Sequence, residues 1–204
     1  KETAELSASF ACKKEYESIF YIAGLLHDLG KYQTAFQEYI RNGGKRGSVP
    51  HASWGAGFTR IKHMLEMSFA IDGHHKGIPD NSTWKFDTEP FTRNEKEEFE
   101  AVVSRFLEDN QIKESELYAK LLKEIEQTAP HREVFIRYLF SALTDSDWLS
   151  TEKHFEKGIS EIRSDISLPI EEMIQKLESE FSEKSKEGKI NELRNAARYE
   201  ALEK

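Results

Sequence analysis

The stretch "AGLLHDLGKYQTAF", residues 23–36, decides the fold prediction, because a helical pattern ends in it abruptly at His27 and Asp28. The apolar residues before this point recur at the i, i+3, i+4 spacing of a buried helix face, namely Tyr16, Ile19, Phe20, Ala23 and Leu26. An imidazole, a carboxylate, Gly30 and Lys31 then follow within five residues. The sequence therefore predicts a core helix whose end presents polar groups, either as a solvated helix terminus or as part of a metal site.

The same helical spacing recurs along the chain, whereas no segment alternates apolar and polar residues as a strand would. The apolar positions of residues 132–144 predict a strongly buried helix that begins near Pro130 and ends near Asp145. Thr92 and Glu95 have the spacing of a capping box that starts a helix running to Phe106. We expect an all-α domain with two irregular loops, the Gly-rich basic segment 41–50 and the Pro-containing segment 76–91.

The composition is that of a globular chain, with 204 residues, 38% hydrophobic and 32% charged. No apolar run approaches the length of a membrane span, so we expect neither a transmembrane helix nor a membrane partner. The single cysteine, Cys12, rules out an internal disulfide and indicates a cytoplasmic protein. The net charge of −8 argues against nucleic-acid binding by bulk electrostatics. It leaves open an enzyme that meets nucleic acid only at a metal centre.

Six side chains, spread along the chain, are the candidate metal ligands: His27, Asp28, His51, His74, His75 and Asp145. Each one alone is weak, because an isolated histidine or aspartate is more often a helix cap or a surface group. Together they are the mixed nitrogen and oxygen donors that divalent transition metals prefer. We expect Asp28 to bridge two ions, with His51, His74 and His75 on the second. His27 and Asp145 would complete the first, which leaves that ion with fewer protein ligands.

The order His-Asp, single His, His-His and Asp resembles that of the HD superfamily of metal-dependent phosphohydrolases. More narrowly, the segments "GLLHDLGKYQTAFQEYI", "HASWGAG", "GHHKGIPD" and "DSDWLSTE" are similar to the HD nuclease domain of the CRISPR type I effector helicase-nuclease. The resemblance implies an HD-domain helical bundle that holds two divalent metal ions (Mn, Fe, Co, Ni or Mg) and cleaves single-stranded DNA in CRISPR interference, as an endonuclease, an exonuclease or both. It implies the six ligands given above, with Asp28 and Lys31 as the catalytic residues.

That family also has a ligand histidine just before a helix of the "ETAELSASF" type, whereas this chain begins at Lys1. We expect this histidine to lie upstream of Lys1, or the first metal site to be incomplete.

The resemblance further implies a domain organisation and partners. Residues 1–181 would form the nuclease domain, and residues 182–204 would be a charged helical connector leading to a helicase domain, in the same polypeptide or as a separate subunit. A guide-RNA surveillance complex would be the other partner. Four basic residues beside the predicted site are candidate DNA contacts, with an ordinary solvated loop as the alternative: Arg41, Lys45, Arg46 and Lys76.

Several other residues have competing interpretations. Trp54 is expected in the core, and Trp84 and Phe86 either in the core or stacked on bases. Asp147 is expected to be a cap or a supporting group, and Trp148 to pack beside the site. Two rival functions remain: a phosphohydrolase of small nucleotides that uses the same site, and a metal-binding module that is inactive because a ligand histidine is missing.

Overall fold

The computed structural model describes residues 1–45, 47–120, 129–155, 158, 169–184 and 187–202. It divides into two units, Lys1–Glu161 and Ile162–Lys204, which are described separately. The described residues form α-helices and short 3-10 helices without any strand, which confirms the all-α prediction. The expected domain boundary is at residue 181, whereas this division falls between Glu161 and Ile162, so the helix after Pro169 belongs to the second unit.

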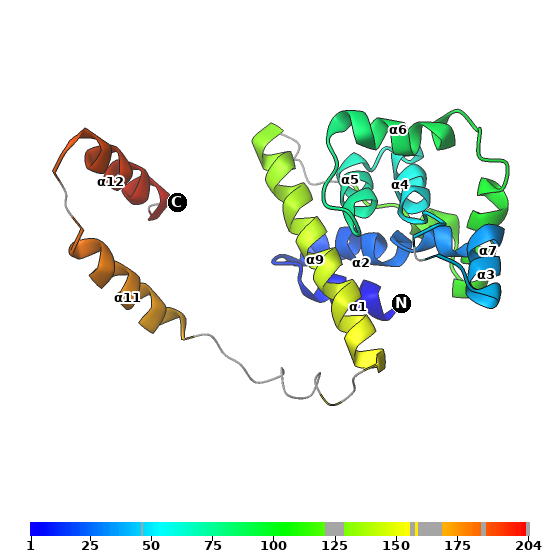
Figure 1. The fold of residues 1–204 in the computed structure, drawn as a ribbon, viewed down its shortest axis with the longest axis horizontal. Helices are drawn as coiled ribbons and strands as arrows, with labels where there is room; N and C mark the ends of the chain where they lie inside the picture. The colour runs from blue at the N-terminus through cyan, green and yellow to red at the C-terminus, as the bar shows by residue number, and fades with distance from the viewer. Residues whose placement is uncertain (46, 121–128, 156–157, 159–168, 185–186, 203–204) are drawn as a thin grey trace. The chain divides into compact units, whose positions relative to one another are not determined.

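The first unit is a bundle arranged around one apolar helix, α2 (Figure 1). Helix α2 packs against α1, α5 and α9, and α4 packs against α5 and α6. The elements of this unit are α1 (Glu2–Ser9), η1 (Lys14–Tyr16), α2 (Glu17–Leu26), η2 (Leu29–Tyr32), α3 (Thr34–Asn42), α4 (Ala52–Ile61), α5 (Leu65–Gly73), α6 (Asn81–Thr92), α7 (Phe99–Asn110), η3 (Glu114–Glu116) and α9 (Ala129–Phe155).

The core lies where α2, α5 and α9 meet. Phe20 and Leu26 of α2, Ile71 of α5, and Leu139 and Leu143 of α9 are all completely buried. Burial of each such side chain stabilises the fold by about 1.5–3 kcal/mol. Because the polar end of α2 follows Leu26 directly, the core fixes where His27 and Asp28 emerge.

Two glycines let the backbone pack closely around this end of α2. A Cβ atom on Gly55 of α4 would lie 2.2 Å from the carbonyl oxygen of Leu26, and one on Gly30 would lie 2.3 Å from the carbonyl oxygen of His51. Real Cβ atoms do not approach that closely, so any side chain at either position would push the elements apart. The glycine after the His-Asp pair therefore allows the start of α4, which carries His51, to lie against η2.

The predicted boundaries hold for one loop and fail for the other. Within segment 41–50, α3 ends at Asn42 and no helix occurs in the described residues that follow, as expected. Segment 76–91 is only partly irregular, because α6 occupies Asn81–Thr92. Asp80 caps this helix, its side chain accepting a hydrogen bond from the Thr83 amide at 2.8 Å. The turn-forming residues before Asn81 therefore mark a helix start rather than a long loop.

The capping box predicted at Thr92 is wrong. Thr92 is the last residue of α6, and its hydroxyl donates to the Glu89 carbonyl oxygen at 2.9 Å. The following helix, α7, starts only at Phe99. The spacing of Thr92 and Glu95 is common enough to arise by chance at a helix C-terminus, where the hydroxyl bonds back into its own helix.

Helix α9 is longer than predicted, since it runs on to Phe155 rather than ending near Asp145. The sequence "TDSDW" contains no glycine or proline to stop it. This continuation determines which aspartate faces the rest of the bundle.

The second unit contains two described helices, α11 (Ile170–Ser182) and α12 (Lys189–Leu202). They meet through the guanidinium of Arg198, which lies 4.4 Å from the centre of the Phe181 ring. The apolar side chains of both helices are largely exposed, among them Ile170, Ile174, Ile190 and Leu193. The assignment of this unit as a connector remains a prediction.

Candidate metal centre

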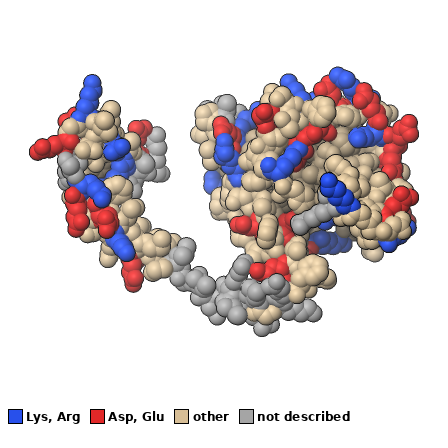
Figure 2. Space-filling view, in the orientation of Figure 1, with Lys and Arg blue, Asp and Glu red and all other residues tan. Residues whose placement is uncertain are grey.

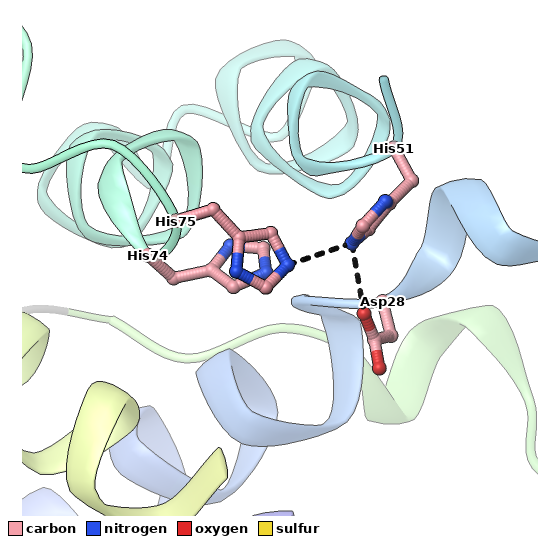
Figure 3. A group of neighbouring side chains, drawn as sticks. All are labelled: Asp28, His51, His74 and His75. Carbon is pink, nitrogen blue, oxygen red and sulfur yellow. Dashed lines mark hydrogen bonds and ion pairs between the residues drawn. The ribbon is translucent and has the colours of Figure 1, made fainter. Parts of the chain in front are cut away.

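The ends of α2 and α5, the start of α4 and an interior turn of α9 bring imidazoles and carboxylates together in two groups. The outer group is defined by Asp28, His51, His74 and His75, and the deep group by His27, Asp28 and Asp147; within each, one ligand atom per residue lies within 4.8 Å of all the others. Figure 3 shows the outer group, with His51 at the start of α4, the two adjacent histidines at the end of α5, and Asp28 after α2. Asp28 belongs to both groups.

In the outer group, His51 stands between a carboxylate and an imidazole (Figure 3). Its Nε2 atom lies 2.9 Å from Nε2 of His75 and 3.3 Å from Oδ1 of Asp28. Two nitrogens that bind one ion at about 2.1 Å each, at a right angle, are about 3 Å apart. The spacing of these two rings therefore suits donors to a common cation.

His74 is buried beneath this pair, with 6% of its surface exposed. Its Nδ1 donates to the carbonyl oxygen of Ile71 at 2.6 Å, and its buried Nε2 has no hydrogen-bond partner. Burial, together with the nearby His27, lowers the pKa of His74 to about 3. The ring is therefore neutral at physiological pH, with Nε2 free to donate a lone pair, which is the state that metal coordination requires.

In the deep group, His27 repeats this arrangement from α2. Its Nδ1 donates to the carbonyl oxygen of Gly24 at 2.7 Å, which fixes the ring and leaves Nε2 facing two carboxylates. Nε2 lies 3.1 Å from Oδ2 of Asp28 and 3.3 Å from Oδ1 of Asp147. Burial alone would lower the pKa of His27, but these two carboxylates raise it to about 9. The carboxylates of Asp28 and Asp147 therefore concentrate negative charge around Nε2 of His27.

Asp28 is the residue on which the two groups converge. Oδ2 faces His27 and also accepts from the Lys31 ammonium at 2.6 Å, while Oδ1 faces His51. Burial raises the pKa of Asp28, but His27, His51 and Lys31 together lower it well below its ordinary value. The carboxylate is therefore ionised, and its two oxygens point into different groups, as a bridging ligand would.

The carboxylate that α9 contributes is Asp147, and the prediction of Asp145 is corrected. Leu143 is fully buried; at 100° per residue, Asp147 lies about 40° from it around the helix and Asp145 about 200°. Asp145 is accordingly exposed and belongs to neither group. The prediction failed because it ended the helix at Asp145. Continuing the spacing of Leu139 and Leu143 for one more turn would have identified Asp147.

The residues fit divalent metal ions. Nε2 of His74 is buried and has neither a hydrogen bond nor an ion pair among the described residues, while Nε2 of His27 and Oδ1 of Asp28 are buried and lie 3.1–3.3 Å from other potential ligands. Buried polar atoms are normally paired, since an unpaired one costs about 1–3 kcal/mol. Each group combines imidazole with carboxylate, the donor set of borderline divalent ions. The outer group would hold one ion, the deep group a second, and Asp28 would contact both.

The basic residues predicted to contact DNA have different surroundings. Lys76 forms ion pairs with Asp87 and, at 3.2 Å, with Asp72, whose carboxylate is fully buried. It therefore links the end of α5 to α6. Arg41 and Lys45 are exposed, while Arg46 lies outside the described residues.

The aromatic residues divide as follows. Trp54 and Trp84 are both buried, which agrees with the core interpretation. Phe86 is 80% exposed and Trp148 is 74% exposed, so the expected packing of Trp148 beside the site is wrong. The ion pairs of Lys76 were missed from the sequence, although the i, i+4 spacing of Asp72 and Lys76 was a usable signal.

Residues 1–130 match the family model described as HD domain. The chain therefore belongs to the HD domain family, and this membership, together with the donor groups, defines it as a metal-dependent phosphohydrolase. The matched range includes His27 and all four residues of the outer group, whereas Asp147 lies beyond it. No curated protein sequence and no solved structure matches the chain significantly.

None of the helices in the described ranges has the length and apolar character needed to cross a bilayer.

Proposed function

We propose that this chain is a divalent-metal-dependent nuclease that cleaves single-stranded DNA in CRISPR interference. The observation that carries the proposal is the pair of donor groups that share Asp28, with Lys31 on the same carboxylate. The choice of DNA as substrate is supported by the resemblance of "GLLHDLGKYQTAFQEYI" and "GHHKGIPD" to the HD nuclease domain of the CRISPR type I helicase-nuclease.

Each protein group has a role in phosphodiester hydrolysis. Two bound ions would supply activation of a water and neutralisation of charge on the phosphoryl oxygens. Asp28 sets the relative position of the two groups, and the backbone acceptors of His27 and His74 orient those rings. Lys31 is 41% exposed and places a positive charge beside Asp28, where it can contact a phosphate oxygen or the leaving oxygen.

We further propose that a helicase, in the same polypeptide or as a separate subunit, and a guide-RNA surveillance complex deliver the strand to this site. On the face shown in Figure 2, acidic and basic side chains are interspersed over the described residues. With a net charge of −8, such a surface attracts a polyanion weakly. A partner that presents single-stranded DNA would compensate for this low intrinsic affinity.

A phosphohydrolase of small nucleotides is the second candidate, and one feature favours it. A hollow of about 250 Å³, lined in part by His27 and Asp28, adjoins the deep group. That volume is close to the lower end of the range for small-molecule sites. A third reading, a metal-binding module without activity, would require that no metal supports hydrolysis.

A substrate and metal panel separates the three. The purified chain, stripped of metal and then supplied with Mn²⁺, Co²⁺, Ni²⁺, Fe²⁺ or Mg²⁺, is incubated with labelled single-stranded DNA, single-stranded RNA, duplex DNA and deoxynucleotides. We expect cleavage of single-stranded DNA with at least one transition metal, and none in EDTA. Hydrolysis of deoxynucleotides alone would establish the nucleotide phosphohydrolase. If no metal supports hydrolysis of any substrate, the inactive metal-binding module is the remaining function.

A further inference from the structure

A second hollow lies beside η2, between α3 and α7. It has a volume of about 880 Å³, and its lining includes Lys31, Tyr32, Ile40, Arg41, Arg105 and Asp109. Lys31 and Tyr32 of η2 also line the smaller hollow beside His27 and Asp28. The two hollows therefore adjoin at η2, and we call the larger one the α3–α7 groove.

Five charged side chains line the α3–α7 groove, among them the carboxylates of Glu108 and Asp109, and three of the five are paired. Lys31 donates to Asp28, Arg105 pairs with Glu98 at 2.5 Å, and Asp109 accepts from the Tyr32 hydroxyl at 2.6 Å. Arg41, at the end of α3, has no ion pair or side-chain hydrogen bond to any residue that the structure describes. Its guanidinium is thus the cation of this groove that is available to a ligand.

The neighbour of Arg41 adds an apolar contact. Ile40 is 60% exposed although it lines the groove, so an apolar side chain and a guanidinium lie next to each other on its wall. A nucleotide presents the complementary pair, a phosphate and a flat apolar base. The position of both, away from the donor groups, suits a nucleotide adjacent to the one at the metal centre.

We propose that the α3–α7 groove binds the nucleotides on one side of the scissile phosphate, with Arg41 contacting a backbone phosphate and Ile40 a base. This inference rests on the proposed nuclease function. A mononucleotide, with its phosphate at the donor groups, leaves this groove empty. The groove is therefore the feature that distinguishes a strand from a small nucleotide.

The test compares Arg41→Glu with Lys14→Glu in the full chain with Mn²⁺. Lys14 is an exposed residue of η1, and the whole of α2, which is about 15 Å long, lies between it and His27. Two substrates are used: a labelled single-stranded oligodeoxynucleotide and bis(p-nitrophenyl) phosphate, a diester too small to reach the groove. Binding of the oligodeoxynucleotide is measured separately by fluorescence anisotropy in EDTA.

We expect Arg41→Glu to lower kcat/KM for the oligodeoxynucleotide roughly tenfold, mainly through KM, since one charge-assisted contact is lost. Its affinity in EDTA should fall by a similar factor and depend less on salt. Hydrolysis of bis(p-nitrophenyl) phosphate should stay within about twofold of wild type, and Lys14→Glu should change neither substrate.

Three outcomes would overturn the inference. Unchanged oligodeoxynucleotide cleavage by Arg41→Glu would show that the groove is not used. An equal loss on both substrates would place the effect at the donor groups instead. An equal loss with Lys14→Glu would show only a general effect of charge. If the wild type cleaves bis(p-nitrophenyl) phosphate but no oligodeoxynucleotide, the proposed function itself fails, which is a distinct result.

Discussion

The outer and deep groups share one carboxylate but differ in what surrounds it. The outer group adds three imidazoles, all from the ends of α4 and α5. The deep group adds one imidazole from α2 and one carboxylate from α9, so it offers fewer protein donors and more negative charge. Because affinity grows with the number of good donors, we expect the outer group to bind its ion more tightly than the deep group. The difference shows how a single bundle can build two unequal sites around one residue.

Removal of Asp28 should have the largest effect, because it removes a ligand from both groups at once. We expect Asp28→Ala to reduce cleavage by at least roughly 10³-fold. Metal content per chain, measured by mass spectrometry after dialysis, should fall in parallel. Circular dichroism should confirm an intact helical fold. Retained activity in a folded variant would disprove the bridging role.

Loss of an outer donor should come next. His51→Gln removes an imidazole that is half-buried and sits at the start of α4, where it is not required for the core. We expect roughly a hundredfold loss of activity and a lower affinity for the more tightly bound ion, seen as a shift in the Mn²⁺ titration of the melting temperature. A normal titration with lost activity would indicate that His51 acts on the substrate rather than on the metal.

Loss of the deep carboxylate should follow. Asp147→Asn leaves the outer group complete, so we expect a loss of roughly tenfold to a hundredfold that excess metal partly restores. Asp145→Asn is the matched control, since the same change on the exposed side of α9 should leave activity within about twofold. If Asp145→Asn were the damaging substitution, the register of α9 at the site would be refuted.

The smallest effect on activity should come from a substitution at Lys76, which supports the outer group without belonging to it. Lys76 follows His75 directly and pairs with the buried Asp72. Lys76→Met should lower the free energy of unfolding by about 1–3 kcal/mol, because a buried carboxylate loses its partner. Activity should fall only a few-fold. Lys85→Met, at an exposed position of α6, is the control for both measurements. A loss of DNA affinity without a loss of stability would instead support the DNA contact predicted for Lys76.

The fold class and most of the donor set could be predicted from the sequence, for a physical reason. Helical periodicity is strong around Phe20 and Leu26, and metal chemistry restricts donors to a few residue types, so His27, Asp28, His51, His74 and His75 stand out even at long separations. The structure places all five in the two groups. Their function as ligands remains a prediction.

The predictions that the structure contradicts concern the residues at which helices begin and end. The two aspartates in "TDSDW" are typical of a helix stop, which favours Asp145, whereas buried packing of Leu139 and Leu143 carries α9 through them. Thr92 shows the same limitation, since its spacing to Glu95 is compatible with a helix start although Thr92 ends α6. The α3–α7 groove could not be predicted, because it depends on how α3 and α7 approach each other.

The most direct test of two unequal metal sites around Asp28 is anomalous diffraction from crystals of this chain grown with Mn²⁺. We predict a strong peak among His51, His74, His75 and Asp28, and a weaker peak among His27, Asp28 and Asp147. No peak at these residues, or a peak beside Asp145 in place of Asp147, would contradict the account.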